Sequence, residues 1–152
     1  MHIHKIDIKN FRMLKDINLF FEEDRVTVIV GRNNSGKTSL AELFRRLLSE
    51  NSPTFNLEDF SLGVHEKFWT AFTLKQKGSE ESEIRETLPV IEVKLILRYN
   101  ENAASLGPLS DFIIDLNPDC VEALIDIRYQ LEDGKIKTFF EGIEFDKETS
   151  ES

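Results

Sequence analysis

Several residue types that build special structures are scarce in this sequence. Cys120 is the only cysteine among 152 residues. No disulfide can therefore form within one chain, and we expect a protein of the reducing cytoplasm. No stretch of 18 apolar residues occurs, so we expect no membrane-spanning helix and no membrane partner. One Trp and two Tyr stand against twelve Phe, a set that suits packing rather than a polar binding surface.

Positive charge is also in short supply. Lysine and arginine total 19 and aspartate and glutamate total 28, which gives a net charge of −9. Binding to nucleic acid needs clustered Lys and Arg, so the chain by itself is a poor nucleic-acid binder. Much of the acidic excess is concentrated in residues 80–86 and 144–151. The net charge therefore does not exclude a basic patch elsewhere in the chain.

Hydrophobic periodicity in the first fifty residues predicts three strands and a helix. Residues 5–9 and 16–21 alternate apolar and polar, which is typical of half-buried strands, and a bend separates them at 10–12. The run 25–30 is β-branched and apolar on both faces, which predicts a central strand covered on both sides. From Lys37 to Ser49, leucine and phenylalanine recur at helical spacing.

The later part of the chain predicts a second helix and mainly antiparallel strands. The runs 123–131 and 136–140 alternate around Asp133-Gly134, which is typical of a tight hairpin. The other elements expected here are a helix over 65–76, a mobile acidic loop over 78–87, a strand over 90–99, a short helix over 109–116 and a frayed tail over 146–152.

A phosphate-binding motif lies between the run 25–30 and the first helix. Gly31-Arg32-Asn33-Asn34-Ser35-Gly36-Lys37-Thr38 satisfies G-x-x-x-x-G-K-[ST] at every fixed position. An apolar β-branched run precedes it and an amphipathic helix follows, which is the context that the motif requires. The alternative, a glycine turn whose lysine points into solvent, is disfavoured by that context. The sequence therefore predicts a Walker A loop that binds a nucleoside triphosphate, with ATP and Mg²⁺ as the expected ligands.

Each part of this loop has a physical role. Gly31 and Gly36 permit backbone angles that a Cβ would forbid, so the chain can wrap closely around phosphate oxygens. The amides of residues 34–39 can form an anion-binding nest, helped by the positive end of the helix. Lys37 should reach the β- and γ-phosphates, which makes it the candidate catalytic residue, and Thr38 should place its hydroxyl on Mg²⁺. The loop residues predicted to bind the nucleotide are Gly31, Asn33, Asn34, Ser35, Gly36, Lys37, Thr38 and Ser39.

Three segments together resemble a known family. Ile6 to Arg12, Ile17-Asn18-Leu19 and Val28 to Leu40 are similar to the N-terminus of ABC-type ATPases of the chromosome-maintenance (SMC) and RecF-like group. The Asn-Phe-Arg bend followed by Asn-Asn-Ser-Gly-Lys-Thr most resembles the overcoming-lysogenization-defect (OLD) family. The resemblance implies an α/β fold of the P-loop NTPase type. In that fold a central strand, the P-loop and a helix accompany an antiparallel β-subdomain, here residues 90–99 and 123–140.

The resemblance also implies partners and further site residues. Heads of this group bind ATP between two subunits, which implies a homodimer of the full-length protein. OLD-like proteins join the ATPase to a C-terminal Toprim nuclease domain and act on DNA, often in defence against phage. Arg12, in the Asn-Phe-Arg bend, is expected near the nucleotide or, equally, in a salt bridge at the bend. Asp59 stands where these proteins often carry an acidic residue, although a helix cap or turn residue is an alternative.

Parts that hydrolysis needs are not evident in the sequence. The nearest match to a Walker B strand, Phe112-Ile113-Ile114-Asp115, is followed by Leu116-Asn117 rather than an acid, and no LSGGQ-like signature occurs. We therefore expect residues 1–152 to be one domain, the N-terminal lobe of a longer ATPase, which alone binds ATP without efficient hydrolysis. A complete binding module in which ATP gates assembly is the alternative. A GTPase or small-molecule kinase is disfavoured because the Asn-Lys-x-Asp pattern is absent.

Overall fold

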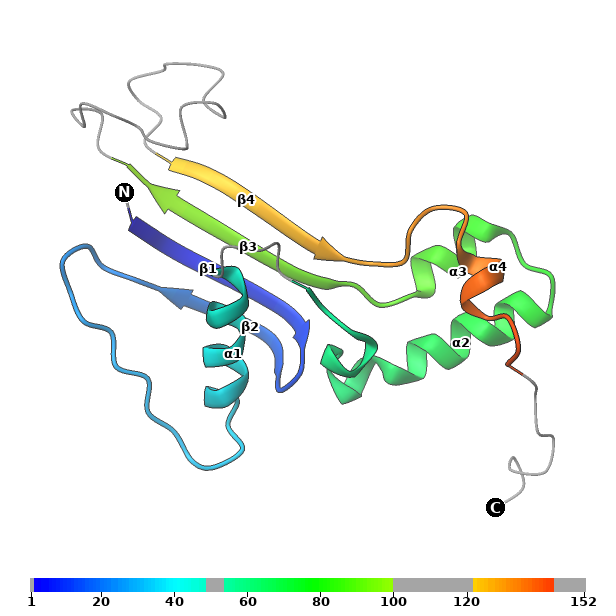
Figure 1. The fold of residues 1–152 in the computed structure, drawn as a ribbon, viewed down its shortest axis with the longest axis horizontal. Helices are drawn as coiled ribbons and strands as arrows, with labels where there is room; N and C mark the ends of the chain where they lie inside the picture. The colour runs from blue at the N-terminus through cyan, green and yellow to red at the C-terminus, as the bar shows by residue number, and fades with distance from the viewer. Residues whose placement is uncertain (1, 49–53, 100–121, 144–152) are drawn as a thin grey trace. The chain divides into compact units, whose positions relative to one another are not determined.

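The structure, a computed structural model, describes residues 2–48, 54–99 and 122–143 (Figure 1). The chain divides into two compact units. The first comprises Met1–Val64 and Val90–Tyr129, and the second comprises His65–Pro89 and Gln130–Ser152. Among the described helices, none has the length and apolar character to cross a membrane.

The first unit is built on a four-stranded antiparallel sheet in the order β2-β1-β3-β4. The strands are β1 (His2–Phe11), β2 (Leu14–Phe20), β3 (Ile91–Arg98) and β4 (Glu122–Tyr129). Ile8 of β1 lies opposite Ile17 of β2 and Val93 of β3, so the apolar positions of neighbouring strands meet on one face. The predicted strands over 5–9, 16–21 and 90–99 are confirmed, as is the first arm of the predicted hairpin.

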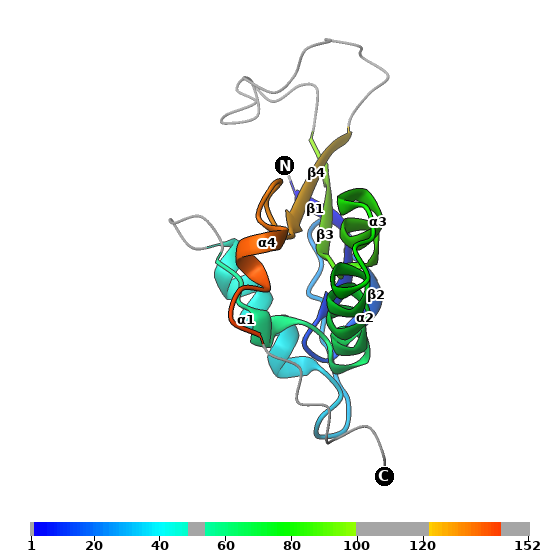
Figure 2. The ribbon, with the colours of Figure 1, turned by 90° about the vertical axis from the view of Figure 1, so that its right-hand side faces the viewer.

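The two faces of this sheet differ in character. Ile6, Ile8 and Val93 are fully buried on the apolar face, and helix α1 (Lys37–Leu47) lies against one face of the sheet (Figure 2). On the other face, Glu92 of β3 pairs with Lys9 of β1 at 3.8 Å and with Arg128 of β4 at 3.1 Å. Burial of one face and cross-strand ion pairs on the other explain the period-2 pattern of the sequence.

A two-residue turn at Arg12 and Met13 joins β1 to β2. Arg12 has φ 48° and Asn10 has φ 60°, values in the left-handed region. The Asn10 side chain donates a hydrogen bond to the carbonyl of Val90 at 2.8 Å, which links the end of β1 to the residue before β3. The bend predicted at 10–12 is thus confirmed.

The prediction of a central strand over residues 25–30 is wrong for this structure. The run is extended coil between β2 and α1 (Figure 1), and Val26 and Val30 are 91% and 84% exposed. A strand requires hydrogen bonds to a neighbour, and in the described part of the chain β2 already pairs with β1 while no segment pairs with this run. The run has the β-branched composition of a strand, but no described segment forms a strand that pairs with it.

The second unit is helical. It contains α2 (His65–Gln76), α3 (Glu81–Thr87) and α4 (Ile136–Phe139). The predicted helix over 65–76 is confirmed. The acidic segment 78–87, expected as a loop, forms α3 instead, because Ile84 and Leu88 lie at i and i+4 and both are buried in the core of this unit.

The second arm of the predicted hairpin is also wrong. Residues 136–139 form a short helix rather than a strand. Ile136 and Phe140 are both buried against Phe72 and Ala71 of α2, and this i, i+4 spacing favours a helical turn over an alternating strand. Asp133-Gly134 therefore makes a turn that leads into a helix. The predicted helix over 109–116, the Phe112–Asp115 segment, Cys120 and the tail over 146–152 lie outside the described residues.

The sheet core predicts a large difference between buried and exposed apolar positions. Replacing Ile8, fully buried in β1, by Ala should lower the free energy of unfolding by about 2–5 kcal/mol, because it leaves a cavity between Ile17 and Val93. The Leu124→Ala change on β4, where the side chain is 64% exposed, should change it by less than about 0.5 kcal/mol. Urea denaturation followed by circular dichroism measures both, and equal losses would contradict the assigned register.

Candidate functional site

The predicted phosphate loop runs directly into α1. Gly36 precedes the helix at φ 91° and its carbonyl accepts the first helical hydrogen bond, from the Leu40 amide at 2.9 Å. Asn34 also has positive φ, at 60°. These left-handed residues turn the loop back on itself, which is the backbone arrangement of an anion-binding nest.

The Lys37 ammonium lies across the opening of this loop. It donates to the carbonyl of Gly31 at 2.6 Å, to the carbonyl of Arg32 at 2.5 Å and to the Ser35 hydroxyl at 3.3 Å. The lysine thus spans the loop from its end to its beginning. The structure therefore brings Lys37 together with the loop residues that the motif predicted would surround phosphate.

The start of α1 is left open to an anion. No side chain caps its first amides, and no acidic residue lies in its first turn. The unpaired amides and the positive end of the helix dipole favour negative charge there. Thr38 is exposed in the first turn, while Ser39 is buried. Asn33, Asn34 and Ser35 are exposed on the loop.

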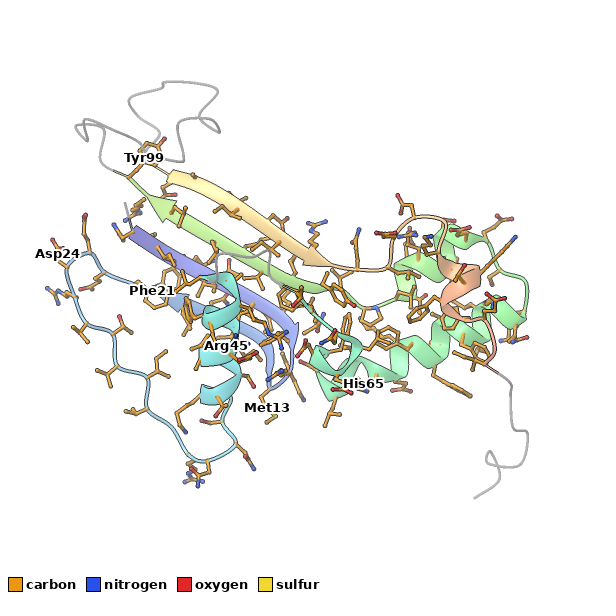
Figure 3. All side chains as sticks on the ribbon, in the orientation of Figure 1. Met13, Phe21, Asp24, Arg45, His65 and Tyr99 are labelled. Carbon is orange, nitrogen blue, oxygen red and sulfur yellow. The ribbon has the colours of Figure 1, made fainter. Side chains whose placement is uncertain are left out.

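Both motif glycines lie where a Cβ would collide. A Cβ on Gly36 would lie 2.9 Å from Leu14 Cδ2 and 3.5 Å from Met13 Cβ. A Cβ on Gly31 would lie 2.7 Å from the Ser35 hydroxyl. The β1–β2 turn, with Met13 labelled at its tip in Figure 3, therefore packs against the end of the phosphate loop. This contact between turn and loop was not predicted from the sequence.

Arg12, the second predicted contributor to the site, is directed at Asp59. Its Nε donates to Asp59 Oδ1 at 2.7 Å, and its main-chain amide donates to the Asp59 carbonyl at 2.7 Å. The Arg12 side chain is 37% exposed. The geometry matches the salt-bridge interpretation of Arg12, and its predicted proximity to a nucleotide stays a prediction. Asp59 also accepts from the Asn56 amide at 2.9 Å, as a cap would.

A second arginine, Arg46 in the last turn of α1, shares the same carboxylate. Its Nη1 donates to Asp59 Oδ2 at 2.6 Å, and its Nε donates to Glu42 Oε1 at 2.8 Å. Glu42 also accepts two hydrogen bonds from Arg45. The bonds from Arg45 and Arg46 lower the pKa of Glu42 to about 2.

The ionisation of Asp59 depends on these partners. Burial by itself would raise the pKa of this carboxyl, but hydrogen bonds from Arg46, the Asn56 amide and Arg12 outweigh burial and lower the pKa. Sequence reasoning missed this network, because Arg45-Arg46 has the pattern of a solvated helix face. The one signal in the sequence that pointed to this network was Asp59 itself, the acidic residue that follows the first helix.

The AAA ATPase domain family matches residues 1–151, and the chain therefore belongs to this family. Membership establishes an ATP-binding domain of the P-loop NTPase type, here with an antiparallel sheet in a mixed α/β arrangement. No solved structure matches the chain significantly.

Two curated relatives share parts of the sequence. The DNA replication and repair protein RecF of Bacillus cytotoxicus is 52% identical over 42 residues, which are 28% of this chain and 11% of that protein. The energy-coupling factor transporter ATP-binding protein EcfA1 of Thermotoga maritima is 29% identical over 96 residues, 50% of this chain and 37% of that protein. The chain thus spans well under two thirds of either relative and resembles a lobe of ABC- and RecF-like ATPases.

Gly36 should be the less replaceable of two glycines in the first unit. Gly36→Ala combines positive φ with a collision against Leu14, so it should cost about 1–2 kcal/mol of unfolding free energy. Gly63→Ala is the matched control, because its Cβ would meet only the end of the Lys15 side chain at 3.8 Å. Chemical denaturation compares the two, and equal stability would show that the loop does not keep this geometry.

Acid should weaken the fold through Glu42 and Asp59. Both carboxyls have a pKa lowered by folding, so their stabilisation is complete above the ordinary values of 4.5 and 3.8 and is lost as the pH falls through the lowered values, about 2 in the case of Glu42. The melting temperature should therefore fall between pH 4.5 and 2. Glu42→Gln should reduce this slope, whereas Glu58→Gln, an exposed neighbour of Asp59, should not. A slope that Glu42→Gln leaves unchanged would contradict the pairing.

Proposed function

We propose that this chain is the ATP-binding N-terminal lobe of an OLD-like or RecF-like ATPase that acts on DNA. Gly31 and residues 33–39 hold the triphosphate, Lys37 contacts the β- and γ-phosphates, and Thr38 is the residue of this chain that binds Mg²⁺. The lobe binds nucleotide and relies on residues outside the described part for hydrolysis.

One observation carries the proposal: the position of the Lys37 ammonium within the loop. Three oxygen acceptors, from Gly31, Arg32 and Ser35, already hold this cation at the start of α1. Phosphate oxygens are oxygen acceptors of the same kind with full negative charge, so they make stronger, charge-assisted hydrogen bonds to the same donor. These contacts support the proposal that the Lys37 ammonium would bind phosphate oxygens.

The residues present also suit Mg²⁺. The Thr38 hydroxyl is an exposed oxygen ligand in the first turn of α1, beside the lysine. No carboxylate in that turn competes with the phosphates for the helix end. When bound, Mg²⁺ would neutralise negative charge on the phosphates, and Thr38 would be its ligand from this chain.

The exposed run 25–30 supports the assignment as one lobe of a larger head. Four apolar side chains here, Val26, Val28, Ile29 and Val30, face solvent in the described structure. A hollow of about 410 Å³ lies beside the run and is lined in part by Phe21, Val26 and Phe44. Apolar surface of this extent is normally covered, and further strands of a larger head would cover it.

The DNA-linked role rests on the RecF relative and on the Asn-Phe-Arg bend. The 52% identity to a DNA replication and repair protein is higher than the identity to the transporter ATP-binding protein, although it spans fewer residues. We propose that the full-length protein dimerises through this head with ATP between subunits and that its DNA-directed activity, repair or antiviral defence, resides outside residues 1–152.

Lys37→Ala should abolish measurable Mg-ATP binding while the fold is retained, because the charged phosphate contact is lost and the half-buried lysine bonds only within its own loop in the described structure. Arg32→Ala is the matched control: it removes the same charge from the same loop at a variable position of the motif, and it should keep affinity within about twofold. Isothermal titration calorimetry measures both, and circular dichroism checks the fold.

Two results would overturn the proposal. Unchanged affinity in Lys37→Ala would show that Lys37 does not contact phosphate. Equal losses of affinity in Lys37→Ala and Arg32→Ala would show that only the net charge of the loop matters. Competition between ATP and GTP in the same assay shows which nucleotide base the chain prefers. A preference for GTP would contradict the ATPase assignment.

A further inference from the structure

Asp59 is a buried acidic side chain of the first unit. It is 2% exposed, and its carboxylate accepts hydrogen bonds from Arg12, Arg46 and the Asn56 amide. A buried carboxylate is tolerated only when it is paired and hydrogen-bonded. Its partners come from separate parts of the chain, so Asp59 joins elements that are distant in sequence.

The first of these elements is the β1–β2 turn. Arg12 is tied to Asp59 twice, through its main-chain amide to the Asp59 carbonyl and through its Nε to the carboxylate. The neighbouring main chain is tied as well, since the Ser61 amide donates to the carbonyl of Asn10 at 2.9 Å. The turn therefore cannot shift relative to residues 59–61 without breaking several hydrogen bonds.

The second element is the phosphate-loop helix. Arg46 has a side chain only 12% exposed, and both of its Nη atoms reach the Asp59 carboxylate, at 2.6 and 3.3 Å. Because α1 starts at the phosphate loop and carries Arg46 in its last turn, Asp59 holds the far end of the helix whose near end carries Lys37.

The turn and the loop meet at Gly36. The space where a Gly36 Cβ would stand is bounded by Leu14 and Met13, the residues that follow Arg12. Asp59 thus acts on the loop along two routes, through Arg12 and the turn that packs on Gly36, and through Arg46 and the axis of α1. A small displacement of either would move the amides that face the phosphates, and ligand sites are sensitive to shifts of about 1 Å.

We propose that Asp59 is a positioning residue for the phosphate loop, which locks the β1–β2 turn and α1 in the register that phosphate binding requires. The inference rests on the proposed function of the loop. It adds to that function a residue that does not contact the nucleotide and whose role is to fix the geometry of residues that do.

Glu42 provides a matched control for a purely stabilising role. It is the other carboxylate partner of Arg46, at 2.8 Å, but its remaining partner, Arg45, lies on the same helix. Removing its charge therefore leaves the tie between the turn and the helix in place. Asp59→Asn and Glu42→Gln each remove one carboxylate from Arg46 and differ in whether Arg12 also loses a charged acceptor.

The test measures Mg-ATP affinity of the 152-residue chain by calorimetry and amide hydrogen exchange without nucleotide, at a temperature where denaturation shows each variant folded. Asp59→Asn should weaken binding about tenfold or more and accelerate exchange at Met13, Leu14 and Gly36. Glu42→Gln should stay within about twofold of the unmodified chain and leave exchange at those positions unchanged. If Asp59→Asn does not fold, Asp59→Glu takes its place, because it keeps the charge and lengthens the side chain that bonds Arg12 and Arg46. Its loss of affinity should lie between the about twofold limit for Glu42→Gln and the about tenfold loss expected for Asp59→Asn.

Each outcome decides the matter. Lower stability of Asp59→Asn with unchanged affinity and unchanged exchange at Gly36 would overturn the positioning role and leave the proposed function intact. Equal losses of affinity in Asp59→Asn and Glu42→Gln would reduce the effect to general destabilisation. Failure of the unmodified chain to bind Mg-ATP would overturn the proposed function and the positioning role together, whatever the variants do.

Discussion

The carboxylate of Asp59 is buried and is shared by two guanidinium groups, one from the β1–β2 turn and one from α1. A charge that is buried away from water holds its hydrogen-bonding partners in place, because each lost hydrogen bond leaves a charged group unsatisfied. Arg12 brings the β1–β2 turn to it and Arg46 brings the end of α1. In sequence the phosphate loop lies between these two arginines, and the proposed positioning role of Asp59 rests on this arrangement.

The loop itself shows how far local sequence determines a site. The spacing of Gly31, Gly36 and Lys37 predicted a loop that wraps phosphate oxygens and a lysine that reaches them. In the structure Lys37 lies across that loop, and its contact with phosphate stays a prediction. The helix that follows was predicted from leucine periodicity and is present. These features are local: they depend on backbone freedom and on amphipathic spacing within about twenty residues, which a sequence displays directly.

What could not be predicted depends on contacts between distant segments. Residues 25–30 have the composition of a central strand but lack a neighbour in the described structure, so composition alone was misleading. Ile136 and Phe140 fit an alternating strand as well as a helical turn, and their burial against α2 decided for the helix. The Asp59 network joins side chains 13 and 47 residues away in sequence, and no local pattern marks such pairs.

The exposed run and the family together give a consistent physical account. Membership in the AAA ATPase domain family brings a nucleotide-binding loop. The exposed apolar side chains of residues 25–30, beside that loop, form a surface of the kind that folded proteins normally cover. We propose that the first unit holds the phosphate-binding half of an ATP site and that the remainder of the head would supply the cover and the hydrolytic groups.

The most direct test of the central claim is a residue-resolved titration of the chain with Mg²⁺ and a non-hydrolysable ATP analogue, followed by amide chemical shifts. The account predicts the largest changes at residues 31–39, with smaller changes at Met13 and Leu14 through their packing on Gly36. Shifts that are absent from residues 31–39, or that concentrate on the polar face of the sheet, would contradict it.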